Sequence, residues 1–305
     1  MKIKIGIPRA FLYYRYYVLW KNFFEFLGCN IVLSSPTNKE IVSLGINNSI
    51  DESCLSSKIY IGHVMSIMDK CDYLLVPRIC DYGKTEKVCV RFNGLYDNIK
   101  NQFPNIKMLD YNIEYTKHKY EFFEFIKMGF CVNKNVFKII LSYIIAKKKE
   151  KEYNICLNKR QNSDLRNIKK KILIVSHPYN IYDKYIGEPI TDYFKKKNMT
   201  LIYADRLNKK IAKEYYNYYS PTLYWTYSKE LVGAIYYYKN AVDGIIFLTS
   251  FPCGPDSLVN ELIIRKENNL PILNLIVDEA TSPIGLETRL ESFLDVINQE
   301  ENYYE

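Results

Sequence analysis

The sequence predicts an α/β fold with two Rossmann-like (flavodoxin-like) halves, whose parallel sheets face a central cleft and are joined by a helical connector. Three observations predict it. Buried-strand and amphipathic-helix patterns alternate at both ends of the chain, the strand pattern is missing between them, and segments of the first part recur 170 residues later. We expect a first half over 1–115, a connector over 116–165 and a second half over 166–305.

The first half opens with an apolar strand pattern over 2–8. A helix is expected over 12–28, because its apolar residues recur at helical spacing and a glycine, Gly28, ends the pattern. Further strands are expected over 30–35, 72–77 and 105–110. Further helices are expected after a Thr37 or Asn38 cap and over 54–70.

The second half repeats this order. Pro8 and Pro178 each end a strand pattern, "KIGIP" and "LIVSHP". The helix patterns that follow end at Gly28 and Asn198, and "NIVLS" and "TLIYA" come next at the same offset of 170 residues. Two similar halves are the simplest interpretation, and chance similarity between two α/β units is the alternative.

Two later strand patterns each run into a cysteine. "DYLLVP" leads to Cys80, and "DGIIFLTS" leads to Cys253. Open parallel sheets bind ligands at the carboxyl ends of their strands. We therefore expect residues from both halves to meet in the cleft.

Composition narrows the class of protein. The chain has 305 residues, eight cysteines and a net charge of +8. No apolar run reaches the roughly 20 residues of a membrane span, and the start of the chain is too short in apolar length for a signal peptide. We expect a cytoplasmic protein with thiols rather than disulfides and no membrane partner. Lysines cluster over 146–153 and 167–172, but exposed helix faces account for them and we expect no nucleic-acid partner.

Familiar nucleotide and hydrolase motifs are missing from the sequence. There is no G-x-x-x-x-G-K-[ST], no G-x-G-x-x-G and no G-x-S-x-G. The twelve glycines leave few for a phosphate-binding loop, and the presence of only three histidines argues against a histidine-based metal site. His177, at the end of a strand pattern, is the one histidine placed where a ligand could lie.

Three cysteines stand at special loop positions. Cys54 follows "SIDES", which predicts a helix start, so its sulfur falls in the first turn, where the helix dipole favours a thiolate. Cys89 follows a polar loop, and Cys253 precedes Gly254-Pro255-Asp256, another helix start. Three thiolates without histidine suit iron–sulfur ligation better than zinc, although spacing alone leaves a zinc or metal-free protein open.

Several segments together resemble the acyl-CoA dehydratase activase-related proteins, which are akin to the cluster-bearing subunits of 2-hydroxyacyl-CoA dehydratases. The segments are "IGIPRAFLYYRYYVLWKNFFEFLGCNIVLSSPTNKEI", "DESCLSSKIYIGHV", "VPRI", "FNGLYDNIK", "HPYNIYD", "FPCGPDS" and "ETRLESF". The resemblance implies a 4Fe–4S cluster on Cys54, Cys89 and Cys253, with Cys80 as a candidate fourth ligand or a spare thiol.

The same resemblance implies a function. The protein would take low-potential electrons from an ATP-dependent activase, as a radical dehydratase or an ATP-coupled reductase component, and reduce or dehydrate a small acyl-CoA-like substrate. The alternative is a non-catalytic iron–sulfur carrier, or electron-transfer module, that docks on a partner protein. Arg9, Arg78 and His177, near predicted strand ends, are the candidate pocket residues. The related dehydratases pair two cluster-bearing subunits, so a homodimer is expected, and no segment selects a particular substrate.

Overall fold

The computed structural model describes residues 2–299 and divides the chain into two compact units. The units are Met1–Ile155 with Tyr224–Thr226 (unit 1) and Cys156–Leu223 with Tyr227–Glu305 (unit 2). The division falls within a single long helix, α7 (Val136–Leu165). The segment 116–165, expected as a connector, is therefore shared between the two units.

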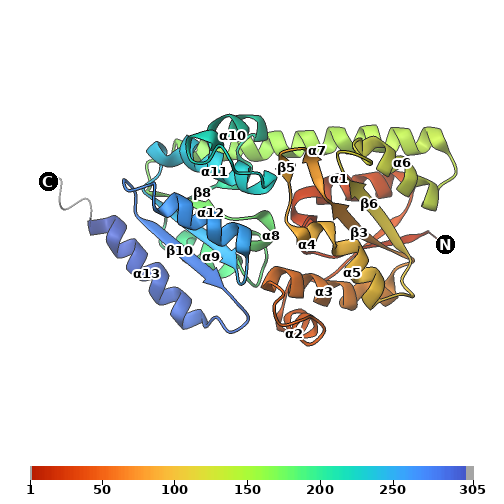
Figure 1. Cartoon of the computed structure of the whole chain (residues 1–305), viewed down its shortest axis with the longest axis horizontal. Coiled ribbons are helices and arrows are strands. Elements are labelled where there is room, and N and C mark those ends of the chain that lie inside the picture. The colour runs from red at the N-terminus through yellow and green to blue at the C-terminus, as the bar shows by residue number, and fades with distance from the viewer. Residues whose placement is uncertain (1, 300–305) are drawn as a thin grey trace. The chain divides into compact units, whose positions relative to one another are not determined.

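Unit 1 is built on a parallel four-stranded sheet in the order β2-β1-β3-β6. Figure 1 labels two of its strands, β3 and β6. Its strands are β1 (Lys4–Ile7), β2 (Asn30–Leu33), β3 (Tyr73–Ile79) and β6 (Met108–Ile113). Its helices are α1 (Tyr13–Leu27), α2 (Lys39–Asn47), α3 (Leu55–Ile67), α4 (Val90–Asn93), α5 (Leu95–Gln102) and α6 (Glu121–Val132), followed by the first part of α7.

Unit 2 is built on a second parallel sheet in the order β10-β9-β7-β8. Its strands are β7 (Lys171–Val175), β8 (Thr200–Tyr203), β9 (Gly244–Ser250) and β10 (Ile272–Val277). Its helices are α8 (Pro178–Ile181), α9 (Glu188–Lys196), α10 (Lys209–Tyr215), α11 (Thr226–Tyr238), α12 (Gly254–Ile264) and α13 (Pro283–Gln299).

The two sheets have the same connectivity. In each unit the first strand lies between the second and the third, and the fourth pairs with the third. This is the strand order of flavodoxin-like folds, in which helices connect parallel strands. Every residue of β9 is buried, as expected for a strand covered on both faces. The predicted fold class, α/β with two Rossmann-like halves, is confirmed.

The repeat extends to the ends of the helices. Gly28 at the end of α1 has φ of 94°, and Asn198 after α9 has φ of 62°. Both residues adopt the left-handed backbone conformation that ends many helices, and glycine and asparagine tolerate it best. A helix-ending residue in the left-handed conformation therefore precedes both β2 and β8, which begin 170 residues apart.

A second repeated signal lies in "SKIYIG" (57–62) and "SKELVG" (228–233), which the sequence analysis did not identify. A Cβ atom on Gly62 would lie 2.0 Å from the carbonyl oxygen of Ile41, and one on Gly233 would lie 1.9 Å from that of Ala212. Each glycine therefore lets its helix, α3 or α11, cross the preceding helix at backbone contact.

The segment between β3 and α4 holds structure that was expected to be a plain loop. It contains a short antiparallel hairpin, β4 (Asp81–Gly83) and β5 (Glu86–Lys87). Lys87 also forms an isolated bridge with Trp225, and its N–H donates to the carbonyl oxygen of Tyr224. These contacts explain why Tyr224–Thr226 belongs to unit 1.

None of the helices within residues 2–299 combines the length and apolar character needed to cross a bilayer.

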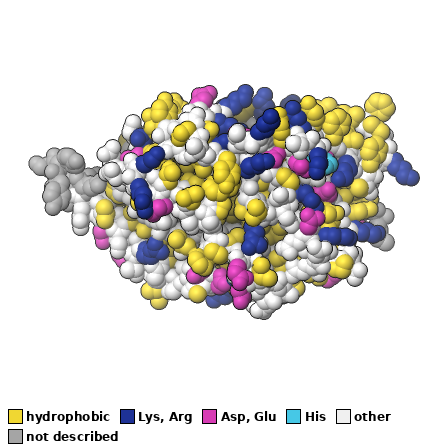
Figure 2. Space-filling view, in the orientation of Figure 1, with side chains coloured by type: hydrophobic (Ala, Val, Ile, Leu, Met, Phe, Trp, Pro, Cys, Tyr) yellow, Lys and Arg dark blue, Asp and Glu magenta, His cyan; other side chains and the backbone are white. Residues whose placement is uncertain are grey.

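Figure 2 shows one face of the protein, on which Lys and Arg side chains are interspersed with acidic and hydrophobic ones. Hydrophobic side chains gather where α6 and the start of α7 lie (Figures 1 and 2). The exposed ones there include Phe123, Phe130, Phe137, Leu141 and Ile144.

Candidate functional site

Cys54 is the N-cap residue of α3. Its backbone is extended, with φ of −63° and ψ of 150°, and its carbonyl oxygen accepts hydrogen bonds from the N–H groups of Ser57 (2.8 Å) and Lys58 (3.1 Å). The helix therefore begins at Leu55, one residue later than the sequence predicted. The half-buried sulfur lies at the positive end of a 13-residue helix, the setting that favours a thiolate.

Cys89 is the N-cap residue of α4, a helix of only four residues. Its carbonyl oxygen accepts a hydrogen bond from Phe92 (3.0 Å). Gly94 ends α4 and serves as the N-cap of α5, so two helix starts follow Cys89 within six residues. Cys89 thus lies beyond the carboxyl end of β3, as expected from the sequence.

A side-chain hydrogen bond joins the segments around Cys54 and Cys89 within unit 1. Arg91 Nη2 donates to the carbonyl oxygen of Glu52 at 3.4 Å. A cavity of about 760 Å³ lies against both segments. It is lined by Asn48, Ser49, Ile50, Ser53, Ser57, Ile61, Val90, Arg91, Gly94, Leu95, Asn98, Asn101 and Gln102. Residues directly next to each cysteine, Ser53 and Val90, therefore line one cavity.

Cys80 has a different environment. Its thiol donates to Asn93 Oδ1 at 2.8 Å, and its carbonyl oxygen accepts from the N–H of Val88. Burial, followed by the charge of Glu114, raises the pKa of this thiol. Both effects favour a protonated sulfur rather than a thiolate.

Cys253 is the N-cap residue of α12 in unit 2, and the N–H of Ser257 donates to its carbonyl oxygen at 3.0 Å. Its thiol donates a hydrogen bond to Asp256 in the first turn of the same helix. Asp256 Oδ1 lies 2.9 Å from His177 Nε2, and both residues are buried. A thiol, a carboxylate and an imidazole are therefore joined at the carboxyl ends of β7 and β9.

Neighbouring residues stabilise the charged form of the Asp256 carboxyl group. Burial would raise the pKa of its carboxyl group, but the charge of His177, and hydrogen bonds from His177 and Cys253, bring that pKa below its ordinary value. The His177 ring is stacked on Tyr179, with 5.1 Å between the ring centroids. His177, a candidate pocket residue from the sequence, thus lies next to a candidate ligand.

Arg9 lies just beyond β1, and its backbone N–H donates to Ser34 Oγ at 2.9 Å. The same hydroxyl lies 2.8 Å from His63 Nδ1, and Thr37 Oγ1 lies 2.9 Å from His63 Nε2. Burial, followed by the charge of Arg9, lowers the pKa of His63 to about 3. His63 is therefore a neutral, hydrogen-bonded core residue.

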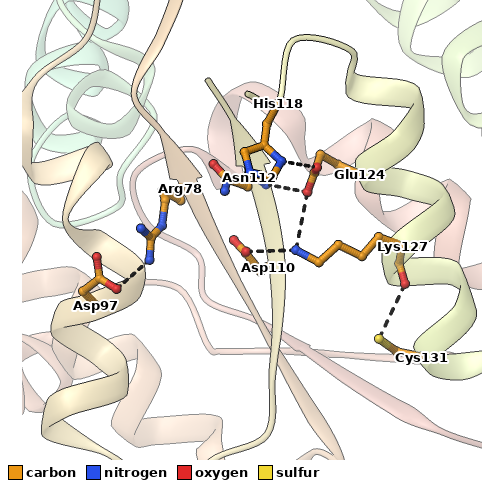
Figure 3. Close-up of polar contacts among 8 residues, drawn as sticks. All are labelled: Arg78, Asp97, Asp110, Asn112, His118, Glu124, Lys127 and Cys131. Atoms are coloured by element: carbon orange, nitrogen blue, oxygen red, sulfur yellow. Dashed lines mark hydrogen bonds and ion pairs between the residues drawn. The ribbon is translucent and has the colours of Figure 1, made fainter. Parts of the chain in front are cut away.

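Arg78, the third candidate pocket residue, lies within β3 rather than beyond it. Its Nη2 donates to Asp97 Oδ1 at 2.5 Å, and its guanidinium lies over the Tyr96 ring (Figure 3). In the register of the sheet, Arg78 pairs with Asn112 of β6. The guanidinium is thus held in unit 1 by an ion pair and an aromatic ring.

A polar network around the buried Glu124 lies beside Arg78, between β6 and α6 (Figure 3). Glu124 accepts from the Asn112 N–H at 3.4 Å and lies 2.9 Å from His118 Nδ1, and Lys127 bridges it to Asp110. The carboxylate of Asp110 helps to raise the pKa of Lys127 against the effect of burial. This network fastens α6 to the edge strand of the sheet.

Two buried lysines at equivalent positions were missed in the sequence. Lys58 and Lys229 are 4% and 1% exposed, and each lies in the first turns of its helix within the repeated S-K-x-x-x-G segment. The repetition of that segment was the signal that could have revealed them. Arg91 and the serines beside Cys54 were also missed, because only folding brings them to one cavity.

Of the three cysteines expected to bind a cluster, Cys54 and Cys89 belong to unit 1 and Cys253 belongs to unit 2. Across residues 2–299, no group of three or more His, Cys, Asp or Glu side chains is arranged to hold a metal ion. All eight cysteines lie in the described part of the chain and are thiols rather than disulfides.

The fold and these residues define a two-unit α/β protein with cysteines at helix N-termini. The family model described as CoA enzyme activase uncharacterised domain (DUF2229) matches residues 4–207. Because this match covers more than half of the chain, the protein belongs to that family. The matched region includes Cys54, Cys89 and His177 and ends before Cys253.

No curated protein matches the chain by sequence. Two solved structures of the SBP FpvC from Pseudomonas aeruginosa align over 99% of this chain, at 12% identity. The complex with Ni²⁺ is covered over 98% of its length with a TM-score of 0.28, and the complex with Mn²⁺ over 100% with 0.26. Similarities at these TM-scores carry no argument about fold or function.

Proposed function

We propose that this protein is a cytoplasmic redox protein that holds a 4Fe–4S cluster on Cys54, Cys89 and Cys253. In the proposed reaction it accepts low-potential electrons from an ATP-dependent activase and reduces or dehydrates a small acyl-CoA-like substrate. A homodimer, as in dehydratases that pair two cluster-bearing subunits, is part of the proposal. Membership of a CoA enzyme activase-related family supports an ATP-dependent partner or a CoA-type substrate.

The observation that carries the proposal is the shared position of the three cysteines. Each is the N-cap residue of a helix, and none of the three side chains caps its own helix. Helix N-termini stabilise thiolates, and thiolates are the ligands of iron–sulfur clusters. Three thiols at helix starts are the type of donor that an iron–sulfur cluster requires, and this shared position supports the proposal.

Residues around these cysteines would hold them in place. Cys54 and Cys253 are fixed by the backbone hydrogen bonds that begin α3 and α12. Asp256, in the first turn of α12, lies 2.9 Å from His177 Nε2, so this pair fixes the turn that carries Cys253. A bound cluster would supply one-electron transfer at low potential and an iron atom with an open position.

Cys80 is left out of the proposed ligand set. Its thiol is occupied by Asn93, and its raised pKa disfavours the thiolate that iron requires. A Cys80→Ser variant should therefore keep the cluster.

The test begins with anaerobic purification and reconstitution with iron and sulfide. The reconstituted protein is mixed with an ATP-dependent activase, ATP and a low-potential electron donor, and its visible absorption and electron paramagnetic resonance spectra are followed. We expect ATP-dependent reduction of the cluster and, with acyl-CoA substrates, turnover. Reduction without turnover of any acyl-CoA would favour the electron carrier instead. A colourless, iron-free product would contradict both functions.

A further inference from the structure

We propose that the cavity of unit 1 binds a small organic acid, with the carboxylate of the ligand at Arg91. The inference rests on the proposed function in one respect, because it assigns the class of small molecule that would lie beside Cys54 and Cys89. The cavity volume of about 760 Å³ is within the range of ligand sites, roughly 300–1,000 Å³.

The charge of the cavity favours an anion. Among the residues that line it, Arg91 alone has a charged side chain. Asp97 is near in sequence, but its carboxylate is paired with Arg78 and it does not line the cavity. A guanidinium binds a carboxylate through two parallel hydrogen bonds, so a single arginine suffices to recognise one carboxylate.

One hydroxyl group in the cavity wall lacks a partner among the described residues. Ser49 Oγ is buried without a hydrogen bond. Two further serines, Ser53 and Ser57, line the cavity and are each 5% exposed. Buried hydroxyls are normally hydrogen bonded, so the unpaired Ser49 hydroxyl in this cavity indicates a polar ligand.

Two helix starts add positive potential at the cavity. Ser57 lies in the first turn of α3, and Leu95 is the first residue of α5. Neither helix has a side-chain cap. Their dipoles therefore reinforce the charge of Arg91.

The rest of the lining distinguishes a carboxylic acid from phosphate. Four amide side chains, Asn48, Asn98, Asn101 and Gln102, can bond hydroxyl or carbonyl groups of the ligand. The apolar side chains Ile50, Ile61, Val90 and Leu95 can contact its alkyl part. Phosphate sites usually gather several cations or a nest of backbone N–H groups, whereas this cavity offers one cation.

The test measures binding to the full chain, with and without reconstituted iron, by titration calorimetry and ligand-observed NMR. The probes are propionate, its neutral amide propionamide, and inorganic phosphate. We expect propionate to bind, propionamide and phosphate to bind at least tenfold more weakly, and Arg91→Met to weaken propionate about tenfold or more. Arg91→Lys should restore part of the loss. Arg166→Met, at an exposed arginine of unit 2, should have no effect.

A second variant, Ser53→Ala with Ser57→Ala, should also weaken propionate while leaving the thermal midpoint within a few degrees. Three results would each overturn the assignment. The wild type and Arg91→Met could bind propionate equally, propionate could fail to bind, or phosphate could bind more tightly than propionate in an Arg91-dependent way. Iron incorporation without propionate binding overturns the cavity proposal alone. Arg91-dependent binding in a protein that takes up no iron overturns the cluster proposal alone.

Discussion

At the scale of single residues, two buried histidines differ in their partners. His63 lies between two hydroxyl groups, those of Ser34 and Thr37, whereas His177 lies against the carboxylate of Asp256. A neutral partner cannot compensate a charged imidazole in a buried site, but a carboxylate can. The first histidine therefore belongs to the core of unit 1, and the second to the candidate site of unit 2.

His63 makes stability depend on pH. Its pKa is about 3 in the folded chain and 6.5 ordinarily, so the unfolded chain binds the proton more tightly. Stability should therefore fall as the pH drops below 6.5, by about 2 kcal/mol at pH 5 from this group, at 1.36 kcal/mol per pH unit. Between pH 7 and pH 5, the free energy of unfolding of His63→Gln, measured with urea, should change less with pH than that of the wild type. His118→Gln, at a more exposed position, is the control, and an unchanged slope in His63→Gln would contradict the assignment.

Asp256 gives a pH dependence of the same sign as His63, but in a lower pH range. Its folded pKa lies below the ordinary value of 3.8, so its contribution is complete above pH 3.8 and is lost as the pH falls through the folded pKa. Asp256→Asn should lower the free energy of unfolding at pH 7 by about 1–3 kcal/mol, because it replaces the charged acceptor of His177 by a neutral amide in a buried site. Asp192→Asn, at an exposed ion pair, should change it by less than about 0.5 kcal/mol. Equal losses in the two variants, measured by urea unfolding, would mean that the buried pair is not formed.

At the scale of elements, close helix crossings organise both units. Gly62 and Gly233 allow α3 and α11 to touch the backbone of the preceding helix, and an added Cβ would come within 2.0 Å and 1.9 Å of a carbonyl oxygen. Because a backbone atom cannot move aside as a side chain can, these positions accept only glycine.

Substitution of these glycines should therefore be costly. Gly62→Ala should destabilise the protein by about 2 kcal/mol or more, because α2 and α3 would have to separate. Gly285→Ala in α13 is the matched control, since the nearest atom to its added Cβ would be Ser282 Oγ at 4.0 Å. That control should be neutral or stabilising by up to about 1 kcal/mol. Thermal or urea unfolding that ranks the two variants the other way would refute the helix crossing.

The elements that sequence patterns predicted are the ones with local signals. "KIGIP" and "DGIIFLTS" form β1 and β9, and Asn38 caps α2 by accepting from the Ile41 N–H at 2.9 Å. The β4–β5 hairpin was missed because two- and three-residue strands leave no periodic pattern. Its pairing with Trp225 joins residues more than a hundred positions apart, which no local pattern encodes.

The same limit applies to the candidate site. Turn residues identified Cys54, Cys89 and Cys253, and all three are N-caps. The contact of His177 with Asp256 spans 79 positions, and the cavity is assembled from α3, α4, α5 and the segment before α3. These features depend on tertiary packing, so only the structure reveals them.

At the scale of the whole molecule, the chain is two copies of one topological plan. Both units order their strands in the same way, and in each a candidate cysteine is the N-cap residue of the helix that follows the third strand of the sheet. Cys89 and Cys253 are therefore topological counterparts. Cys54 has no cysteine counterpart, because Trp225 precedes α11 where Cys54 precedes α3. The proposed ligand set is therefore not symmetric between the two units.

The most direct test of the central claim is the iron and sulfide content of single cysteine variants after anaerobic reconstitution. Cys54→Ser, Cys89→Ser and Cys253→Ser should each lose most of the iron and the visible absorption of the wild type, since each removes one proposed ligand. Cys131→Ser, at an exposed thiol on α6, and Cys71→Ser should keep both. Full iron content in any of the first three variants, or no iron in the wild type, would contradict the proposed cluster.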